Sequence, residues 1–170
     1  MKVVEALKKI KANRKKITDL NSKIACIASH MENEADSLAY KNPADKVKEF
    51  VQSAFDTQRE NSKLLSRVQK TNLNTLVTVE LGGVQVTKTV AEWVYRRREG
   101  VDHEIETYRN MRTNMKPGAI QKPDGTIIVN NVIRNYDEEQ RDKRMAILQE
   151  EKSLIDAALE ITNAVTDLIE

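Results

Sequence analysis

The chain has 170 residues, with 28 Lys and Arg against 26 Asp and Glu, and its 32% charged and 4% aromatic composition favours long, exposed helices. The length allows one domain with a core of its own. The net charge of +2 excludes a protein whose whole surface is basic and binds polyanions, although a local basic patch stays possible. No apolar run reaches the roughly 20 residues of a membrane span, and no signal-peptide pattern follows Met1. A lone Cys26 fits a reducing compartment, so we expect a cytoplasmic protein without a membrane span.

Apolar residues recur every seven positions in the first segment. Val3, Ile10, Ile17, Ile24 and Met31 form one seam position, whereas Ala6, Leu20 and Ile27, with the polar Asn13, form the second. This pattern predicts a helix of about 29 residues that packs a narrow stripe on partner helices. Cys26 lies beside this seam, and we expect it to be a small buried hydrophobe.

A second helix is predicted from Pro43 to about residue 72. Asn42 is suited to the N-cap, Pro43 to the first helical position and Asp45 to the first turn. The interval 56–63 holds no strongly apolar residue. That interval is therefore either exposed or in contact with something polar.

The hydrophobic period then changes from helical to two. A β-hairpin is predicted over about 76–88, with a primed turn at Gly82-Gly83. Its alternation places five apolar residues on one face, namely Val77, Val79, Leu81, Val84 and Val86. An isolated hairpin is marginal in water, so this face must lie on the bundle or on another subunit.

Thr89-Val90-Ala91-Glu92 is a capping box, which predicts a third helix that ends before Pro117-Gly118. A second hairpin with a longer loop is predicted over about 119–130. Asp137 is suited to cap a last helix that runs to the end of the sequence.

An internal repeat indicates how these helices are organised. A shift of 91 residues places Thr71-Asn72-Leu73-Asn74-Thr75 on Thr162-Asn163-Ala164-Val165-Thr166, and Val3 on Val94. The expected fold is α+β and mainly α: a single domain, 1–170, in which two helix-pair repeats form an antiparallel four-helix bundle with β-hairpin insertions. We favour helix-end chemistry over ligand binding for Thr-Asn-x-x-Thr, because Asn and Thr satisfy backbone groups where helices stop.

The repeat also carries a resemblance. The stretch Arg67–Thr75 is similar to the "I-N-x-T-N-L-x-T" segment of the septicolysin-like family of small bacterial and phage-encoded proteins, and the end of the chain is similar to that family's "N-x-x-T-E-L". The match spans most of 60–170, and departs from the family in the second hairpin and at Ala164-Val165. Further matching residues are Gly83, Val86, Thr87, Glu92, Arg97 and Arg98. The resemblance implies a helical bundle with hairpins that forms a ring-like or other homo-oligomer, without established catalytic activity.

Residues suited to catalysis or metal binding are sparse. His30 lies near Glu32, Glu34 and Asp36, but acidic connections are common at helix ends. His103 has acidic neighbours, yet the Glu-x-x-His spacing of di-metal bundles is absent, and one Cys with two separated His does not suit zinc. We therefore expect no enzyme, catalytic residue, metal or cofactor.

The first helix offers the best case for nucleic acid. Its net charge over residues 1–24 is +6, and the candidate polyanion contacts are Lys8, Lys9, Lys11, Arg14, Lys15 and Lys16. Basic and acidic helices of one bundle more often pair with each other, and the last helix is acidic. The triplet Arg96–Arg98 is a second basic patch that could contact nucleic acid. The alternatives are that it is a solvated face or that it pairs with an acidic partner in another subunit.

The apolar hairpin faces and the long heptad helix exceed what four helices need for their own core. We therefore expect a non-enzymatic homo-oligomeric structural or assembly protein, in its specific form a phage virion or particle component that contacts other particle proteins. Its expected interface is the first hairpin with Trp93 behind it. Two alternatives remain: a nucleic-acid-binding module that uses the basic first helix, and a cytolysin-like toxin, as the family name suggests.

Overall fold

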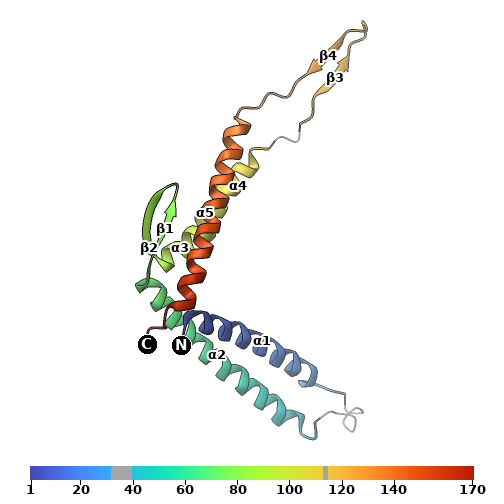
Figure 1. The fold of residues 1–170 in the computed structure, drawn as a ribbon. Helices are drawn as coiled ribbons and strands as arrows, with labels where there is room; N and C mark the ends of the chain where they lie inside the picture. Colours follow the sequence, from blue (N-terminus) through green and yellow to red (C-terminus); the bar gives the residue numbers. More distant parts are fainter. Residues whose placement is uncertain (32–39, 113–114) are drawn as a thin grey trace. The chain divides into compact units, whose positions relative to one another are not determined.

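The computed structural model describes residues 1–31, 40–112 and 115–170 and is mainly helical, with two small antiparallel sheets (Figure 1). The chain divides into two compact units. Unit 1 comprises residues 1–77, 89–91 and 160–170, and unit 2 comprises 78–88 and 92–159. The predicted helical character and both small sheets are thus present, whereas the single four-helix bundle stays a prediction.

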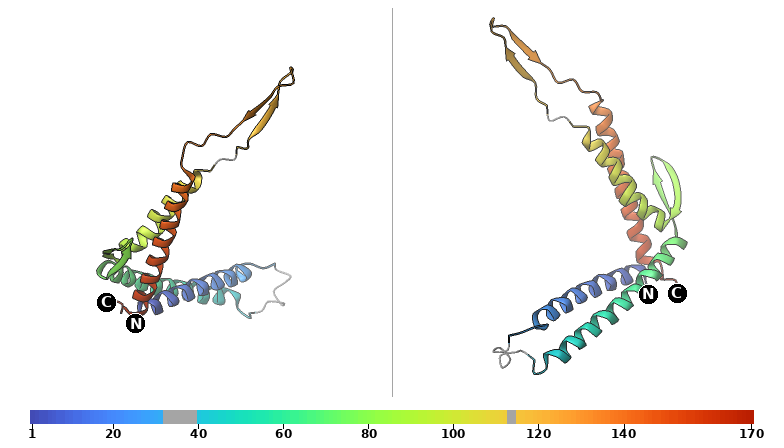
Figure 2. Two further views of the ribbon diagram at one scale, coloured as in Figure 1. Left: turned by 45° about the horizontal axis from the view of Figure 1, so that its top comes forward. Right: turned by 180° about the vertical axis from the view of Figure 1, so that it is seen from behind.

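Helices α1 (Val3–Ile27) and α2 (Pro43–Asn74) lie side by side and antiparallel in unit 1 (Figures 1 and 2). The side chain of Asn42 caps α2 as predicted, because its oxygen accepts a hydrogen bond from the Asp45 amide at 3.3 Å. Helix α1 ends four residues before Met31, which is exposed. Cys26 is also exposed, so the expectation of a buried thiol was wrong. Ile24 and Ile27 are the residues of this turn that pack against the core. Cys26 lies about 100° from Ile27 around the helix and therefore points away from that core.

The core between α1 and α2 is interrupted by a polar layer. One apolar cluster joins Val3, Ala6 and Ile10 to Leu64, Val68 and Leu168, and a second joins Leu20 to Phe50 and Ala54. The polar layer between them consists of Asn13, Thr57, Glu60 and Asn61.

Hydrogen bonds hold one side of this polar layer. Asn13 Nδ2 donates to Glu60 Oε2 at 2.9 Å, and Lys9 Nζ lies 2.5 Å from Glu60 Oε1. These two bonds hold the pKa of Glu60 below its usual value, and the bond from Lys9 has the larger effect. Asn61 is only 2% exposed, and its Oδ1 has no hydrogen-bond partner in the part of the chain that the structure describes. The interval 56–63 therefore has polar contacts, which was one of the two predicted alternatives.

Both Thr-Asn-x-x-Thr motifs end a helix with the same hydrogen bonds. The Thr75 amide donates to the Thr71 carbonyl at 3.0 Å, and the Thr166 amide donates to the Thr162 carbonyl at 2.9 Å. Each motif's last carbonyl then accepts from the first residue of another helix: Thr75 from the Val90 amide at 2.9 Å, and Thr166 from the Val3 amide at 3.0 Å. The predicted helix-end role is confirmed. Val90 and Val3 therefore occupy equivalent positions, because each donates to the last carbonyl of a Thr-Asn-x-x-Thr motif. The shift of 91 residues instead pairs Val3 with Val94.

The first hairpin pairs β1 (Leu76–Leu81) with β2 (Val84–Thr89). Gly82 and Gly83 both have positive φ, 58° and 82°, as a primed two-residue turn requires. The hydroxyls of Thr78 and Thr87 lie 2.7 Å apart across the strands, which agrees with the register that a two-residue turn at Gly82-Gly83 imposes, with Leu81 opposite Val84.

The predicted third helix consists of three consecutive parts. Helix α3 (Val90–Tyr95) leads into a π-helical segment, η2 (Arg96–Val101), and then into α4 (Asp102–Asn110). Helix α5 (Glu138–Val165) completes the helices, and the Asp137 carboxylate caps it by accepting from the amides of Glu139 and Gln140. The buried side chains of unit 2 come from these helices and the first hairpin: Val79, Trp93, Val101, Ile105, Leu148, Ile155 and Leu159.

Residues 115–136 form an arm between α4 and α5 that carries the second hairpin (Figure 1). Strands β3 (Gly118–Gln121) and β4 (Ile127–Asn130) pair antiparallel, with Ile120 opposite Ile128. Every residue of both strands is exposed. The arm therefore has an ordered backbone pairing without an apolar core of its own.

Replacing Asn61 by Leu should raise the free energy of unfolding by about 1–2 kcal/mol, because a buried acceptor without a partner costs about that much. Chemical denaturation followed by circular dichroism measures the change, and Asn21→Leu, at an exposed position of α1, is the matched control with an expected change near zero. A loss of stability in Asn61→Leu would show that the buried amide has a hydrogen-bond partner in solution.

Candidate functional site

Arg96, the first residue of η2, is the centre of a charge network in unit 2. Its Nε and Nη2 donate to the two carboxylate oxygens of Glu151 on α5, at 2.7 and 3.0 Å, and its Nη1 bonds Glu104 on α4. These bonds, above all the one to Glu151, raise the pKa of Arg96. A Cβ at Gly100 would lie 2.9 Å from Nη1 and 3.0 Å from Cδ of Arg96, so a larger residue there would require this side chain to shift.

Arg97 extends this network along α5. Its guanidinium bonds both carboxylate oxygens of Asp156 at 2.9 and 3.1 Å. Asp102 accepts from Lys152 Nζ at 2.6 Å, and this bond lowers the pKa of Asp102. Arg96 and Arg97 therefore have acidic partners within their own unit, and only Arg98 of the basic triplet is exposed.

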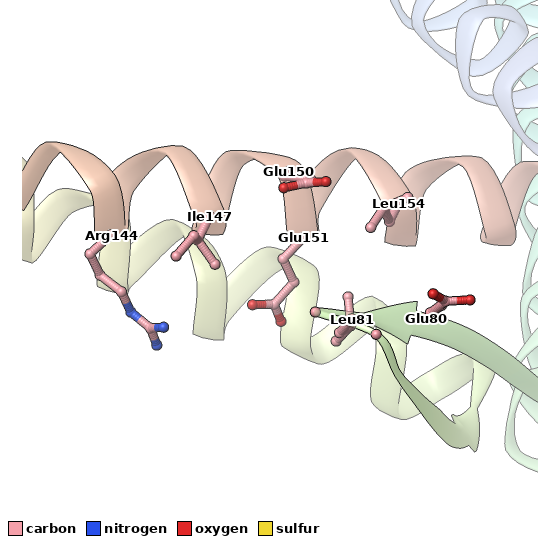
Figure 3. Close-up of a pocket in the computed structure, with 9 residues that line it drawn as sticks. Glu80, Leu81, Arg144, Ile147, Glu150, Glu151 and Leu154 are labelled. Carbon is pink, nitrogen blue, oxygen red and sulfur yellow. The ribbon is translucent and has the colours of Figure 1, made fainter.

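A groove lies beside this network, between the tip of the first hairpin and α5 (Figure 3). It encloses about 660 Å³. Its apolar lining is Leu81 on β1 with Ile147 and Leu154 on α5, and its charged lining is Glu80, Arg144, Glu150 and Glu151. Glu151 and Arg144 have ion-pair partners, Arg96 and Glu104 respectively. Glu80 and Glu150 form no ion pair with any residue that the structure describes.

A second hollow of about 330 Å³ lies where the arm joins α4 and α5. Arg141 spans it: its Nη1 donates to the Met111 carbonyl at 3.0 Å and to the Tyr136 hydroxyl at 3.1 Å. The same guanidinium lies over the Tyr136 ring, 5.3 Å from the ring centroid. One side chain of α5 thus binds the C-cap of α4 and the last residue of the arm.

Some residues of the predicted hairpin interface are buried within the chain, and others are accessible to a partner. Val77, Val79 and Trp93 are buried within the chain, so their side chains are not available to a partner in this structure. Leu81 and Val86 are half-buried, and Val84 is exposed. The prediction of a subunit contact here therefore depends on Leu81, Val84 and Val86.

The predicted polyanion contacts all lie on α1 and are exposed. Lys9 is bound to Glu60, as described above. The other five form no ion pair within the described ranges 1–31, 40–112 and 115–170; they are Lys8, Lys11, Arg14, Lys15 and Lys16.

Neither a metal centre nor a membrane span is found in the described residues. They contain no group of three His, Cys, Asp or Glu side chains placed to hold a metal ion. The acidic residues near His30, namely Glu32, Glu34 and Asp36, lie outside the described residues. None of the helices in those residues combines the length and apolarity needed to cross a bilayer.

Comparisons with protein-family models, with curated proteins and with solved structures gave no significant match. The resemblance to the septicolysin-like family therefore stays a prediction.

Replacing Arg96 by Ala should destabilise unit 2 by about 2 kcal/mol, because Glu151 would lose its bidentate partner in a partly buried position. The side chains of Arg96 and Glu151 are 26% and 14% exposed, so water cannot fully replace the lost bonds. Arg98→Ala, on the same turn but exposed, is the matched control, with an expected change within about 0.5 kcal/mol. Equal stabilities of the two variants in urea denaturation would contradict this role of Arg96.

Proposed function

We propose that this chain is a non-enzymatic homo-oligomeric structural or assembly protein whose subunits meet through the β-hairpins. The observation that carries the proposal is the exposure of the arm, where Ile120, Ile127 and Val129 are 58, 62 and 60% exposed. A two-stranded hairpin with apolar side chains on both faces is marginal in water and gains stability when a partner covers it.

The alternation of the arm hairpin supports a contact on both of its faces. Ile120 and Ile128 are directly opposite and share one face, whereas Ile127 and Val129 belong to the other. A hairpin that packs on one surface needs only one apolar face. An arm that inserts between two surfaces needs both, which is the pattern of this sequence.

Two finer points of the proposal rest on sequence alone. In the assembled protein the two helix pairs pack as the antiparallel four-helix bundle that the repeat predicts. By the resemblance to phage-encoded proteins, the assembly is a virion or particle component that contacts other particle proteins.

The test is native mass by light scattering behind a sizing column, at low salt and at 0.5 M salt. The expected result is one closed multiple of the 19.4 kDa chain at both salts. The variant Ile120→Thr/Ile127→Thr/Val129→Thr keeps strand propensity but removes the apolar surface, so it should shift the protein to monomer. Leu73→Gln, at an exposed position of α2 outside both hairpins, is the control that should leave the mass unchanged. A monomeric wild type would contradict the proposal.

Basic residues of α1 that form no ion pair with any described residue favour a second candidate, a nucleic-acid-binding module. Lys8, Lys11 and Lys15 are spaced three and four apart, so they lie on one helical face. If this face binds phosphate, Lys8→Gln/Lys11→Gln/Lys15→Gln should weaken binding to a mixed-sequence DNA duplex and reduce its salt dependence, since fewer counterions are released. Lys41→Gln/Lys48→Gln/Lys63→Gln is the control of equal charge, measured by fluorescence anisotropy. Equal loss in both variants would show only an effect of net charge.

A further inference from the structure

We propose that the groove between the first hairpin and α5 is the docking site for the β3–β4 arm of a second copy of this chain. This inference rests on the proposed homo-oligomeric function and names the two surfaces that meet. The groove is the one lined by Leu81, Ile147 and Leu154 with Glu80 and Glu150 (Figure 3).

The apolar parts of the two surfaces are complementary in kind. The groove presents aliphatic side chains from two opposing elements, Leu81 from β1 and Ile147 and Leu154 from α5. Ile147 and Leu154 are exposed although they lie one heptad apart on the same face of α5. Aliphatic side chains on both faces of the arm would pack against both walls, which a one-faced hairpin could not do.

The charges of the two surfaces are complementary as well. Glu80 and Glu150 lie on opposite walls of the groove, and neither has an ion-pair partner among the described residues. Lys116 and Lys122 flank strand β3 on the arm, and they too form no ion pair in the described part of the chain. Two acids on one surface and two lysines on the other, none of them ion-paired with a described residue, favour this pairing, because opposite charges steer association and fix register.

A second copy is the occupant that fits these observations. Within one chain, both strands of the arm are exposed and the groove stays open, although both belong to unit 2. Every copy carries one arm and one groove, so two copies satisfy both surfaces reciprocally. A closed dimer or a ring follows from the same contact, according to the angle at which copies meet.

Charge reversal in trans tests this inference. The arm variant is Lys116→Glu/Lys122→Glu and the groove variant is Glu80→Lys/Glu150→Lys. Each variant alone places like charges together, so each should raise the dissociation constant of self-association at least tenfold. A mixture of the two variants restores opposite charges at both contacts, so it should assemble with close to the wild-type constant.

Each outcome of this experiment decides one question. Analytical ultracentrifugation of wild type, each variant and the mixture gives the constants, and Lys41→Glu/Lys48→Glu is the control that changes net charge as the arm variant does. Weakening in both variants with recovery in the mixture supports the arm in the groove of another copy.

Other results would overturn the inference in distinguishable ways. Wild-type assembly that neither variant weakens would overturn this docking site and leave the homo-oligomer intact. A wild type that stays monomeric at all concentrations would overturn both proposals. Weakening without recovery in the mixture would overturn docking between copies.

An arm that folds back on its own chain has a distinct signature. In a Cys26→Ser background, Lys122→Cys/Glu150→Cys in one chain should form disulfide-linked oligomers on oxidation, seen on a non-reducing gel. A monomeric, faster-migrating species would show that the occupant is the same chain, against the inference.

Discussion

Two backbone hydrogen bonds in unit 1 fix the topology of the chain: the Val3 amide to the Thr166 carbonyl, and the Val90 amide to the Thr75 carbonyl. Each bond joins the end of one helix to the start of another. In both cases the acceptor is the last threonine of a Thr-Asn-x-x-Thr motif. The bond at Thr75 closes the first hairpin, which makes β1 and β2 an insertion into a helix-to-helix connection. The bond at Thr166 and a second bond, from the Leu168 amide to the Met1 carbonyl, flank the antiparallel bridge between Lys2 and Asp167. The two threonine motifs thus end their helices with the same backbone hydrogen bonds.

Electrostatics take a larger part in unit 2 than in the α1–α2 pair. Arg96 and Arg97 bind the carboxylates of Glu151 and Asp156 on α5, and the π-helical turn brings these two consecutive side chains into place. The charges of Arg96 and Arg97 are therefore neutralised by ion pairs within unit 2. Among the described residues, other cations without an ion pair lie on the exposed face of α1 and on either side of strand β3.

Features that depend on local chemistry were predictable from the sequence. Asn42 and Asp137 cap helices where expected, and Gly82-Gly83 adopts the positive φ angles that only glycine accepts at low cost. Features that depend on distant partners were not. Arg96, the first residue of the π-helical turn, binds Glu151, which lies 55 residues away in the sequence. Period-two alternation predicts which valines share a face but not what covers that face, so the burial of Val79 could not be separated from a subunit contact. The groove escaped prediction for the same reason, because its two walls are remote in sequence.

The polar layer of the α1–α2 pair has a consequence for how the protein opens. Apolar burial couples neighbouring turns of a helix pair into one cooperative unit, and a layer of amides and a carboxylate weakens that coupling. The cluster of Leu20, Phe50 and Ala54 is thereby separated from the cluster of Val3 and Ile10, which also includes Leu168 from the far end of the sequence. We therefore expect amide hydrogens beyond Asn13 to exchange through sub-global opening of the outer helix ends, and those near Val3 to exchange only when the junction itself unfolds. The first helix is continuous in its geometry, and we expect its two halves to open separately.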